Sequence, residues 1–140
     1  MATIELALLV DRLMRRIHVG LQSRAEEFDP HNVGPWGGMV LLTLSDHDGI
    51  EIGALARHLG RDKSQVTRTL ASLESKGFIN RPVSQTDGRV RHVRLTKEGH
   101  AMVETLGKAV AESLDQALGP LASTDLKALE EILERGLSRV

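Results

Sequence analysis

The chain has 140 residues and a formal net charge of -1, and hydrophobic residues make up 41% and charged residues 26% of it. This composition is typical of a globular protein and excludes a disordered chain, so we expect one domain. The absence of cysteine excludes disulfides, thiolate zinc sites and thiol-based redox sensing. Aromatic residues, at 2%, are too few for a base-stacking surface that binds single-stranded nucleic acid.

The sequence contains no run of 18 apolar residues and no cationic segment before its N-terminal apolar patch. These features predict neither a membrane span nor a signal peptide. We therefore expect a cytoplasmic protein with no membrane partner.

Both ends of the chain show helical periodicity. Apolar residues recur at steps of three and four over residues 4–27 and again over residues 96–118. A last amphipathic helix follows a Gly-Pro break, and Ser123 or Thr124 is positioned to cap it. These helices carry more apolar surface than a small centre can cover. We expect a second copy of the chain to cover it, with packing of the helices on each other as the alternative.

A second helix is expected over residues 35–44, after the break "FDPHNVGP" and before "SDHDG". Its start is unusual because Gly37 and Gly38 each cost about 1 kcal/mol in a helix interior.

The centre of the chain has the pattern of two short helices joined by a tight turn. The first presents apolar residues on one face over residues 52–59 and ends at Gly60. The second begins after Asp62, whose carboxylate can cap it in a capping-box arrangement with Gln65, and ends at Gly77. Two short helices with a glycine in the turn predict a helix-turn-helix.

Positive charge is concentrated around this centre. Residues 61–97 contain nine Lys or Arg and three acids, so the segment carries +6 and the remainder of the chain -7. A basic segment in an acidic chain is typical of a surface that binds a polyanion. An ordinary solvated surface is the alternative.

The outer face of the second central helix is polar and cationic. Arg68 can pair with a guanine and Gln65 with an adenine in a major groove, which admits one helix. The residues that we assign to this DNA-binding face are Lys63, Ser64, Gln65, Thr67 and Arg68. A solvated helix face without a ligand is again the alternative.

Two β-prone runs follow, over residues 79–83 and 90–95, and the loop between them contains Asp87-Gly88, a strong hairpin signal. Val93 and Leu95 are expected to face the core. The loop carries Arg89 at its tip, where a cation can reach a minor groove. We assign Arg91 to the same basic surface.

Two of these segments, "KSQVTRTLASLESKGFINR" and "DGRVRHVRLTKEG", resemble the recognition helix and the wing of the MarR family of bacterial winged-helix transcription regulators. The resemblance extends over nearly the whole chain. It implies a mainly α fold with a small β-wing, in a single domain of residues 1–140. Residues 1–33 and 97–140 would be dimerisation helices, and residues 34–96 the winged helix-turn-helix lobe.

The resemblance also implies a function. A homodimer would bind a pseudo-palindromic operator in double-stranded DNA, most simply as a repressor. Ser64, Gln65, Thr67 and Arg68 would meet the major groove and Arg89 the minor groove, with Asp87 supporting the wing.

Many members of the family release DNA when a small aromatic or anionic effector occupies a crevice between the dimer helices and the DNA-binding lobe. The positions that the resemblance assigns to this crevice are Met14, Arg15, His18 and Trp36.

Three other functions compete with this one. A metal-responsive regulator has six histidines to draw on, but no two stand at i, i+4 on one helix, and we assign no metal site and no cofactor. An enzyme is not expected, because the residues of the loop 45–48 (Ser-Asp-His-Asp) are consecutive and point apart. A winged helix that binds protein and not DNA remains open, and it predicts no salt-dependent DNA affinity.

Overall fold

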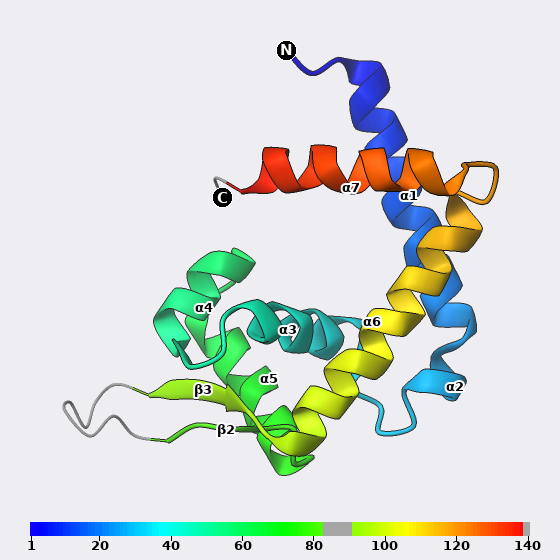
Figure 1. Cartoon of the computed structure of the whole chain (residues 1–140). Helices are drawn as coiled ribbons and strands as arrows, with labels where there is room; N and C mark the ends of the chain where they lie inside the picture. The colour runs from blue at the N-terminus through cyan, green and yellow to red at the C-terminus, as the bar shows by residue number, and fades with distance from the viewer. Residues whose placement is uncertain (83–90, 139–140) are drawn as a thin grey trace.

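The computed structural model describes residues 1–82 and 91–138. Figure 1 shows a lobe of short helices and strands from which two long helices rise, with the last helix running crosswise from the far end of the second. The elements in chain order are α1 (Ile4–Ser23), α2 (Ala25–Phe28), α3 (Gly34–Asp46), β1 (Ile50–Glu51), α4 (Ile52–Leu59), α5 (Lys63–Ser75), β2 (Ile79–Asn80), β3 (His92–Leu95), α6 (Lys97–Ala117) and α7 (Ser123–Leu137). The expected mainly α fold with a small sheet is confirmed.

The sheet has three antiparallel strands in the order β1-β3-β2. Ile50 of β1 lies opposite Val93, and Ile79 of β2 lies opposite Leu95. The sequence predicted only two strands, because β1 is two residues long and too short for alternation to be seen. The predicted Asp87-Gly88 turn lies outside the described residues.

The core of the lobe forms where α3, α4, α5 and the sheet meet the first half of α6. The inward residues expected on α5 and β3 are confirmed, with exposed fractions between 0% and 7% for Val66, Leu70, Leu73, Val93 and Leu95. From α6, Met102 and Leu106 belong to the same cluster. Helix α6 is therefore part of the lobe over its first half.

The turn of the helix-turn-helix forms as predicted. Gly60 adopts a left-handed conformation with φ of 62° and ends α4. Asp62 caps α5 by accepting hydrogen bonds from the Ser64 backbone N–H (3.4 Å) and the Ser64 hydroxyl (2.6 Å). The cap is thus completed by Ser64, where the sequence suggested Gln65.

Helix α6 is joined tightly to the end of α5. The Thr96 hydroxyl donates to the carbonyl oxygen of Gly77 (2.6 Å) and accepts from the Gly99 backbone N–H (3.0 Å), which caps α6. A side chain at Gly99 would overlap the carbonyl oxygen of Phe78. The segment "LTKEG" therefore joins the end of α5 to the start of α6.

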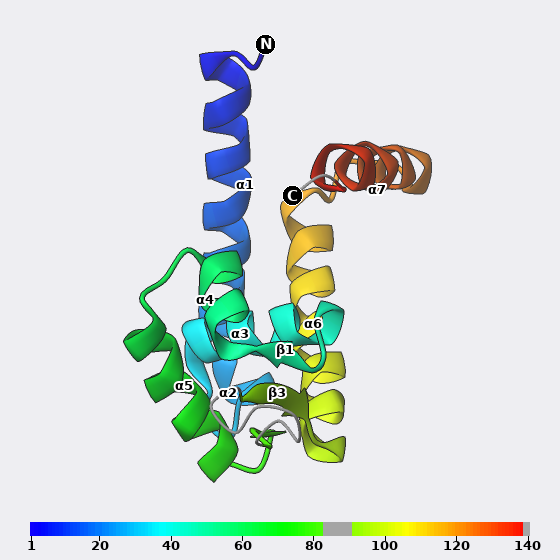
Figure 2. The same ribbon diagram turned by 90° about the vertical axis from the view of Figure 1, so that its left-hand side faces the viewer.

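The two terminal helices leave large apolar faces uncovered. Helix α1 packs along α6, yet neither α1 nor α7 contains a buried residue. Figure 2 shows α1 extending away from the lobe and α7 lying at the far end of α6, with its axis in a different direction. We call the following residues the terminal apolar faces; each is 47–76% exposed: Ile4, Leu6, Leu8, Leu9, Val10, Met14 and Val19 on α1, and Ile132, Leu133 and Leu137 on α7. Apolar surface of this extent marks an interaction site.

The beginning of α7 differs from the expectation in one respect. Its N-cap is Ala122, whose backbone N–H donates to the Asp125 carboxylate (3.3 Å), and neither Ser123 nor Thr124 caps it. Within residues 1–82 and 91–138, no helix has the length and hydropathy needed to cross a membrane.

Candidate nucleic-acid interface

Helix α5 lies at the outer edge of the lobe, as Figure 2 shows. Its buried residues Val66, Leu70 and Leu73 fix its rotation, because all three point into the core. At 100° per residue, Ser64 and Arg68 then lie on the opposite side, and both are exposed. The core packing therefore turns the polar face of α5 outward.

The five residues assigned to DNA binding on α5 are not equally free. Lys63, Ser64 and Arg68 are exposed, and Gln65 and Thr67 lie half-buried on its two flanks. The Thr67 hydroxyl donates to the Lys63 carbonyl oxygen (2.8 Å), and the Ser64 hydroxyl donates to Asp62. The two hydroxyl protons are thus used within the helix, which leaves the long side chains as the main donors to a ligand.

The hydrogen bonds from Ser64 lower the pKa of the Asp62 carboxyl group, with a smaller contribution from the positive charge of Arg68. Asp62 is therefore ionised at neutral pH. Its negative charge at the N-terminus of α5 is favourable for the helix, and it stands at the edge of the polar face.

The structure adds residues that the sequence analysis missed. Ser72 and Ser75 continue the outer face of α5 at steps of four and three from Arg68, and both are exposed. This spacing was visible in the sequence, but without the core there was no reason to extend the face beyond Arg68. Neighbouring segments carry three more exposed cations: Arg57 on α4, Arg61 in the turn before α5 and Lys76 after it.

The base of the wing is held by an ion pair. The Arg81 guanidinium binds the Glu74 carboxylate with Nη2 to Oε1 at 2.9 Å, and this hydrogen bond is the main cause of the lowered pKa of Glu74. Arg91 donates to the Arg81 carbonyl oxygen (3.2 Å). The structure thus places Arg91 at the base of the wing, where it links the two strands. Arg89 and Asp87 lie outside the described residues.

Of the four residues assigned to an effector crevice, three lie within about one turn of α1, and the fourth, Trp36, lies on α3. Met14, Arg15 and His18 are exposed on α1. Trp36, in the first turn of α3, instead donates from its indole Nε1 to the Thr69 hydroxyl on α5 (2.6 Å). Of the four, Arg15 lines a cavity.

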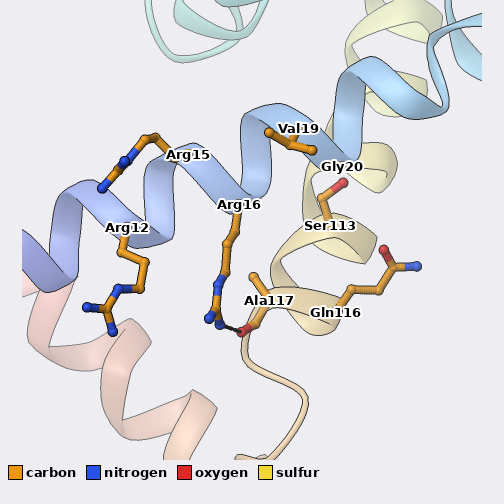
Figure 3. Close-up of a pocket in the computed structure, with 8 residues that line it drawn as sticks. All are labelled: Arg12, Arg15, Arg16, Val19, Gly20, Ser113, Gln116 and Ala117. Carbon is orange, nitrogen blue, oxygen red and sulfur yellow. Dashed lines mark hydrogen bonds between the residues drawn. The ribbon is translucent and has the colours of Figure 1, made fainter.

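That cavity lies between α1 and the second half of α6 and has a volume of about 600 Å³. Figure 3 shows the residues that line it: Arg12, Arg15, Arg16, Val19, Gly20, Ser113, Gln116 and Ala117. Its lining thus contains three arginines and no acid.

The polar groups around this cavity are incompletely paired. The Ser113 hydroxyl is buried without a hydrogen-bond partner among the described residues. Arg16 makes a long hydrogen bond, 3.5 Å, to the Ala117 carbonyl oxygen, whereas Arg15 pairs with Asp11 at 2.7 Å. The arrangement suits an anion, which can accept from the guanidinium groups.

The histidines do not gather into a metal site in the part of the chain that the structure describes. His47 and His58 bring their rings to 4.3 Å between centroids. No group of three or more potential ligands is found within residues 1–82 and 91–138.

Comparisons with known proteins agree with this geometry. Residues 38–90 match the model of the MarR family. The chain is 32% identical to the transcriptional repressor MprA of Escherichia coli K12 over 104 residues, which cover 73% of this chain and 59% of MprA. The chain thus spans about three fifths of the length of this curated relative.

Solved structures share the fold over almost the full length. A point mutant of MepR from S. aureus has a TM-score of 0.78 at 24% identity, with 99% of each chain covered. A point mutant of E. coli MarR complexed with operator DNA has a TM-score of 0.69 at 26% identity, with 96% of this chain and 94% of MarR covered. Sequence motifs, family model and fold agree, and the chain belongs to the MarR family.

Proposed function

We propose that the chain is a sequence-specific regulator of transcription that binds double-stranded DNA as a homodimer, most simply as a repressor in the cytoplasm. The observation that carries the proposal is the outward face of α5, which the core turns to solvent and which Arg68 dominates. A helix of this kind fits the major groove. The name of MprA as a repressor and the operator complex of MarR support the same function.

The proposed contacts follow the positions of the side chains. Lys63, Gln65 and Arg68 reach base edges and phosphates, and the hydroxyl oxygens of Ser64 and Thr67 accept hydrogen bonds at closer range. Arg89 enters the minor groove, and Asp87 supports the wing. Arg91 holds the strands at the base of the wing and adds positive charge there.

The terminal apolar faces support the homodimer. A second copy that covers these faces on α1 and α7 would remove them from water, which is the largest favourable contribution to association. A twofold axis then places two copies of α5 in successive major grooves, about 34 Å apart. Residues 1–33 and 97–140 would form the dimer region and residues 34–96 the DNA-binding lobe, with α6 shared between the two.

The test is the affinity of the protein for the DNA upstream of its own gene, measured by fluorescence anisotropy with random DNA as competitor. Replacement of Arg68 by alanine is expected to cost about 1–3 kcal/mol and to relax the preference at one base position. Lys108→Ala removes an exposed cation from α6 and is expected to leave binding unchanged.

Two results would count against this function. Binding that random DNA abolishes would favour a winged helix whose partner is a protein. An unchanged base preference in Arg68→Ala would remove Arg68 from base recognition. Specific binding should also weaken with salt, because each neutralised phosphate releases about 0.9 counterion.

We further propose that the arginine-lined cavity between α1 and α6 takes the effector, a small anion with an apolar body. Arg12 and Arg16 supply positive charge, Ser113 an unpaired hydroxyl, and Val19 an apolar wall. Because the cavity spans two helices of the dimer region, an occupant can change the angle between them. That change would move the two lobes relative to the operator.

Sodium benzoate is the probe for this proposal, with sodium acetate as the anion that lacks an apolar body. Benzoate is expected to release DNA from the wild type. Arg16→Gln is expected to raise the benzoate concentration needed for release by about tenfold, because the variant loses one charge-assisted hydrogen bond to the anion. Lys108→Gln serves as the matched control. Equal release of the wild type and Arg16→Gln, or equal potency of acetate, would exclude this cavity as the effector site.

A further inference from the structure

Trp36, the only tryptophan of the chain, connects α3 to the helix that we propose reads DNA. Its indole Nε1 donates to the Thr69 hydroxyl at 2.6 Å, and the Thr69 hydroxyl donates to the Gln65 carbonyl oxygen at 3.2 Å. Trp36 and Thr69 are both half-buried, so water competes only partly for these bonds. One chain of hydrogen bonds therefore runs from α3 to the backbone of a residue at the proposed interface.

The ring of Trp36 makes a second contact with the same element. The Arg61 guanidinium carbon lies 5.0 Å from the ring centroid, in the range of a cation–π interaction. Arg61 stands in the turn that precedes α5. Trp36 therefore contacts the recognition helix both before its first residue and in its second turn.

The loop before Trp36 reaches the other end of α5. The Asp29 carboxylate accepts from the backbone N–H groups of Val33 and Gly34, at 2.8 and 2.9 Å, and holds the loop in shape. Lys76, at the C-terminal end of α5, donates to the Asn32 carbonyl oxygen at 3.0 Å. Asn32, in the segment between α2 and α3, thus binds the C-terminal end of the recognition helix, and Trp36, in the first turn of α3, contacts its N-terminal half.

We infer that Trp36 is a positioning residue for DNA recognition: its hydrogen bond to Thr69 limits the rotation that the buried residues still leave to α5, and so the direction in which Gln65 and Arg68 leave the helix. Thr69 and Gln65 stand one turn apart on the flank of α5 that faces α3, while Arg68 faces outward. A hydrogen bond that holds the side of α5 facing α3 therefore also restricts the direction in which the outer face of α5 points. The inference rests on the proposed DNA-binding function.

The test uses two variants that remove the hydrogen bond, of which Thr69→Val also keeps the side-chain volume, and one that retains it. Thr69→Val replaces the hydroxyl by a methyl group, Thr69→Ser retains the hydroxyl, and Trp36→Phe removes the indole N–H but keeps an aromatic ring. Base preference is measured by selection from a randomised operator library, and affinity for random DNA is measured alongside. Thermal unfolding identifies any variant that fails to fold.

Thr69→Val and Trp36→Phe are expected to lower base discrimination by about fivefold to tenfold at the positions read by Gln65 and Arg68, because a freer helix presents both side chains over a wider angle. Affinity for random DNA should stay within about twofold, since phosphate contacts tolerate a small rotation. Thr69→Ser should retain the wild-type preference. The double variant should lose little more base discrimination than Thr69→Val alone, because the bond between Trp36 and Thr69 is already absent in that variant.

A second readout does not depend on DNA. Because Trp36 is the only tryptophan, its emission reports its surroundings directly, and Thr69→Val should shift the emission of the free protein while Thr69→Ser should not. Unchanged emission in Thr69→Val would show that the Trp36 indole and the Thr69 hydroxyl are not hydrogen-bonded. Wild-type base preference in a folded Thr69→Val, or an equal loss of affinity for specific and random DNA, overturns the positioning role. Absence of specific binding by the wild type is a failure of the proposed function itself, and the inference falls with it.

Discussion

Replacement of Val10 by glutamate is expected to convert the proposed homodimer into a monomer and to weaken operator binding by at least roughly 100-fold. Val10 is 47% exposed in the single chain, and glutamate has the higher helix propensity, so α1 itself should remain folded. In the dimer, however, the carboxylate would lie within the terminal apolar faces, and burying an unpaired charge costs several kcal/mol. A monomer would then contact one half-site only.

Light scattering after size-exclusion chromatography measures the mass, and the anisotropy assay measures DNA affinity. Ala101→Glu is the matched control, because it introduces the same side chain at an exposed helical site on α6, outside the terminal apolar faces. It is expected to stay dimeric. A dimeric Val10→Glu with wild-type affinity would show that copies of the chain associate through another surface.

Replacement of Gly99 by alanine is expected to destabilise the fold by at least about 3 kcal/mol. The added methyl group would overlap the carbonyl oxygen of Phe78, which also accepts from the Thr96 backbone N–H at 3.0 Å. The new Cβ and the carbonyl group of Phe78 both belong to or are attached directly to the backbone, so no flexible side chain can move to relieve the overlap. Either α6 moves away from the end of α5 or the cap at Thr96 breaks.

Gly107, on the same helix, provides the control. A Cβ there would meet nothing within 4 Å, so Gly107→Ala is expected to stabilise the protein by about 0.5–1 kcal/mol through the higher helix propensity of alanine. Urea unfolding of the two variants measures the difference. Equal stabilities for Gly99→Ala and Gly107→Ala would contradict the close approach of α6 to Phe78.

The central helices could be predicted because their signals are local. The apolar spacing of residues 52–59, the left-handed turn at Gly60 and the cap at Asp62 are all decided within a few residues, and the structure confirms each. The glycines of α3 are different. Gly37 and Gly38 weaken the helix locally, but both are buried, and a Cβ on Gly37 would lie 2.7 Å from the Val33 side chain. Val33 precedes Gly37 by one turn, so the crowding at Gly37 is local, whereas a Cβ on Gly38 would meet Leu106 of α6 at an ordinary contact distance of 3.7 Å. Steric crowding therefore accounts for the glycine at position 37 and not for the one at position 38.

The residues of the candidate site also differ in whether local sequence signals could reveal them. The polar face of α5 follows from periodicity on one helix, whereas Trp36 and Thr69 are 33 positions apart in sequence and no spacing rule joins them. The resemblance placed Trp36 in an effector crevice, and the structure shows its contact with α5. The cavity brings Arg16 to Ala117 across 101 positions, so it too depends on the fold. The DNA contacts themselves remain predictions.

Helix α6 has 21 residues, with Met102 and Leu106 in the core of the lobe and Ser113 beside Gly20 of α1. One continuous element therefore carries the lobe at one end and the dimer region at the other, and at 1.5 Å per residue it is about 30 Å long. In the proposed dimer, the separation of the two recognition helices is then set by the length and tilt of α6. A helix that contacts no base would thus determine which spacing of half-sites the protein accepts. The protein would not bind an operator with one extra base pair between its halves, because the two recognition helices would no longer match the separation of the half-sites.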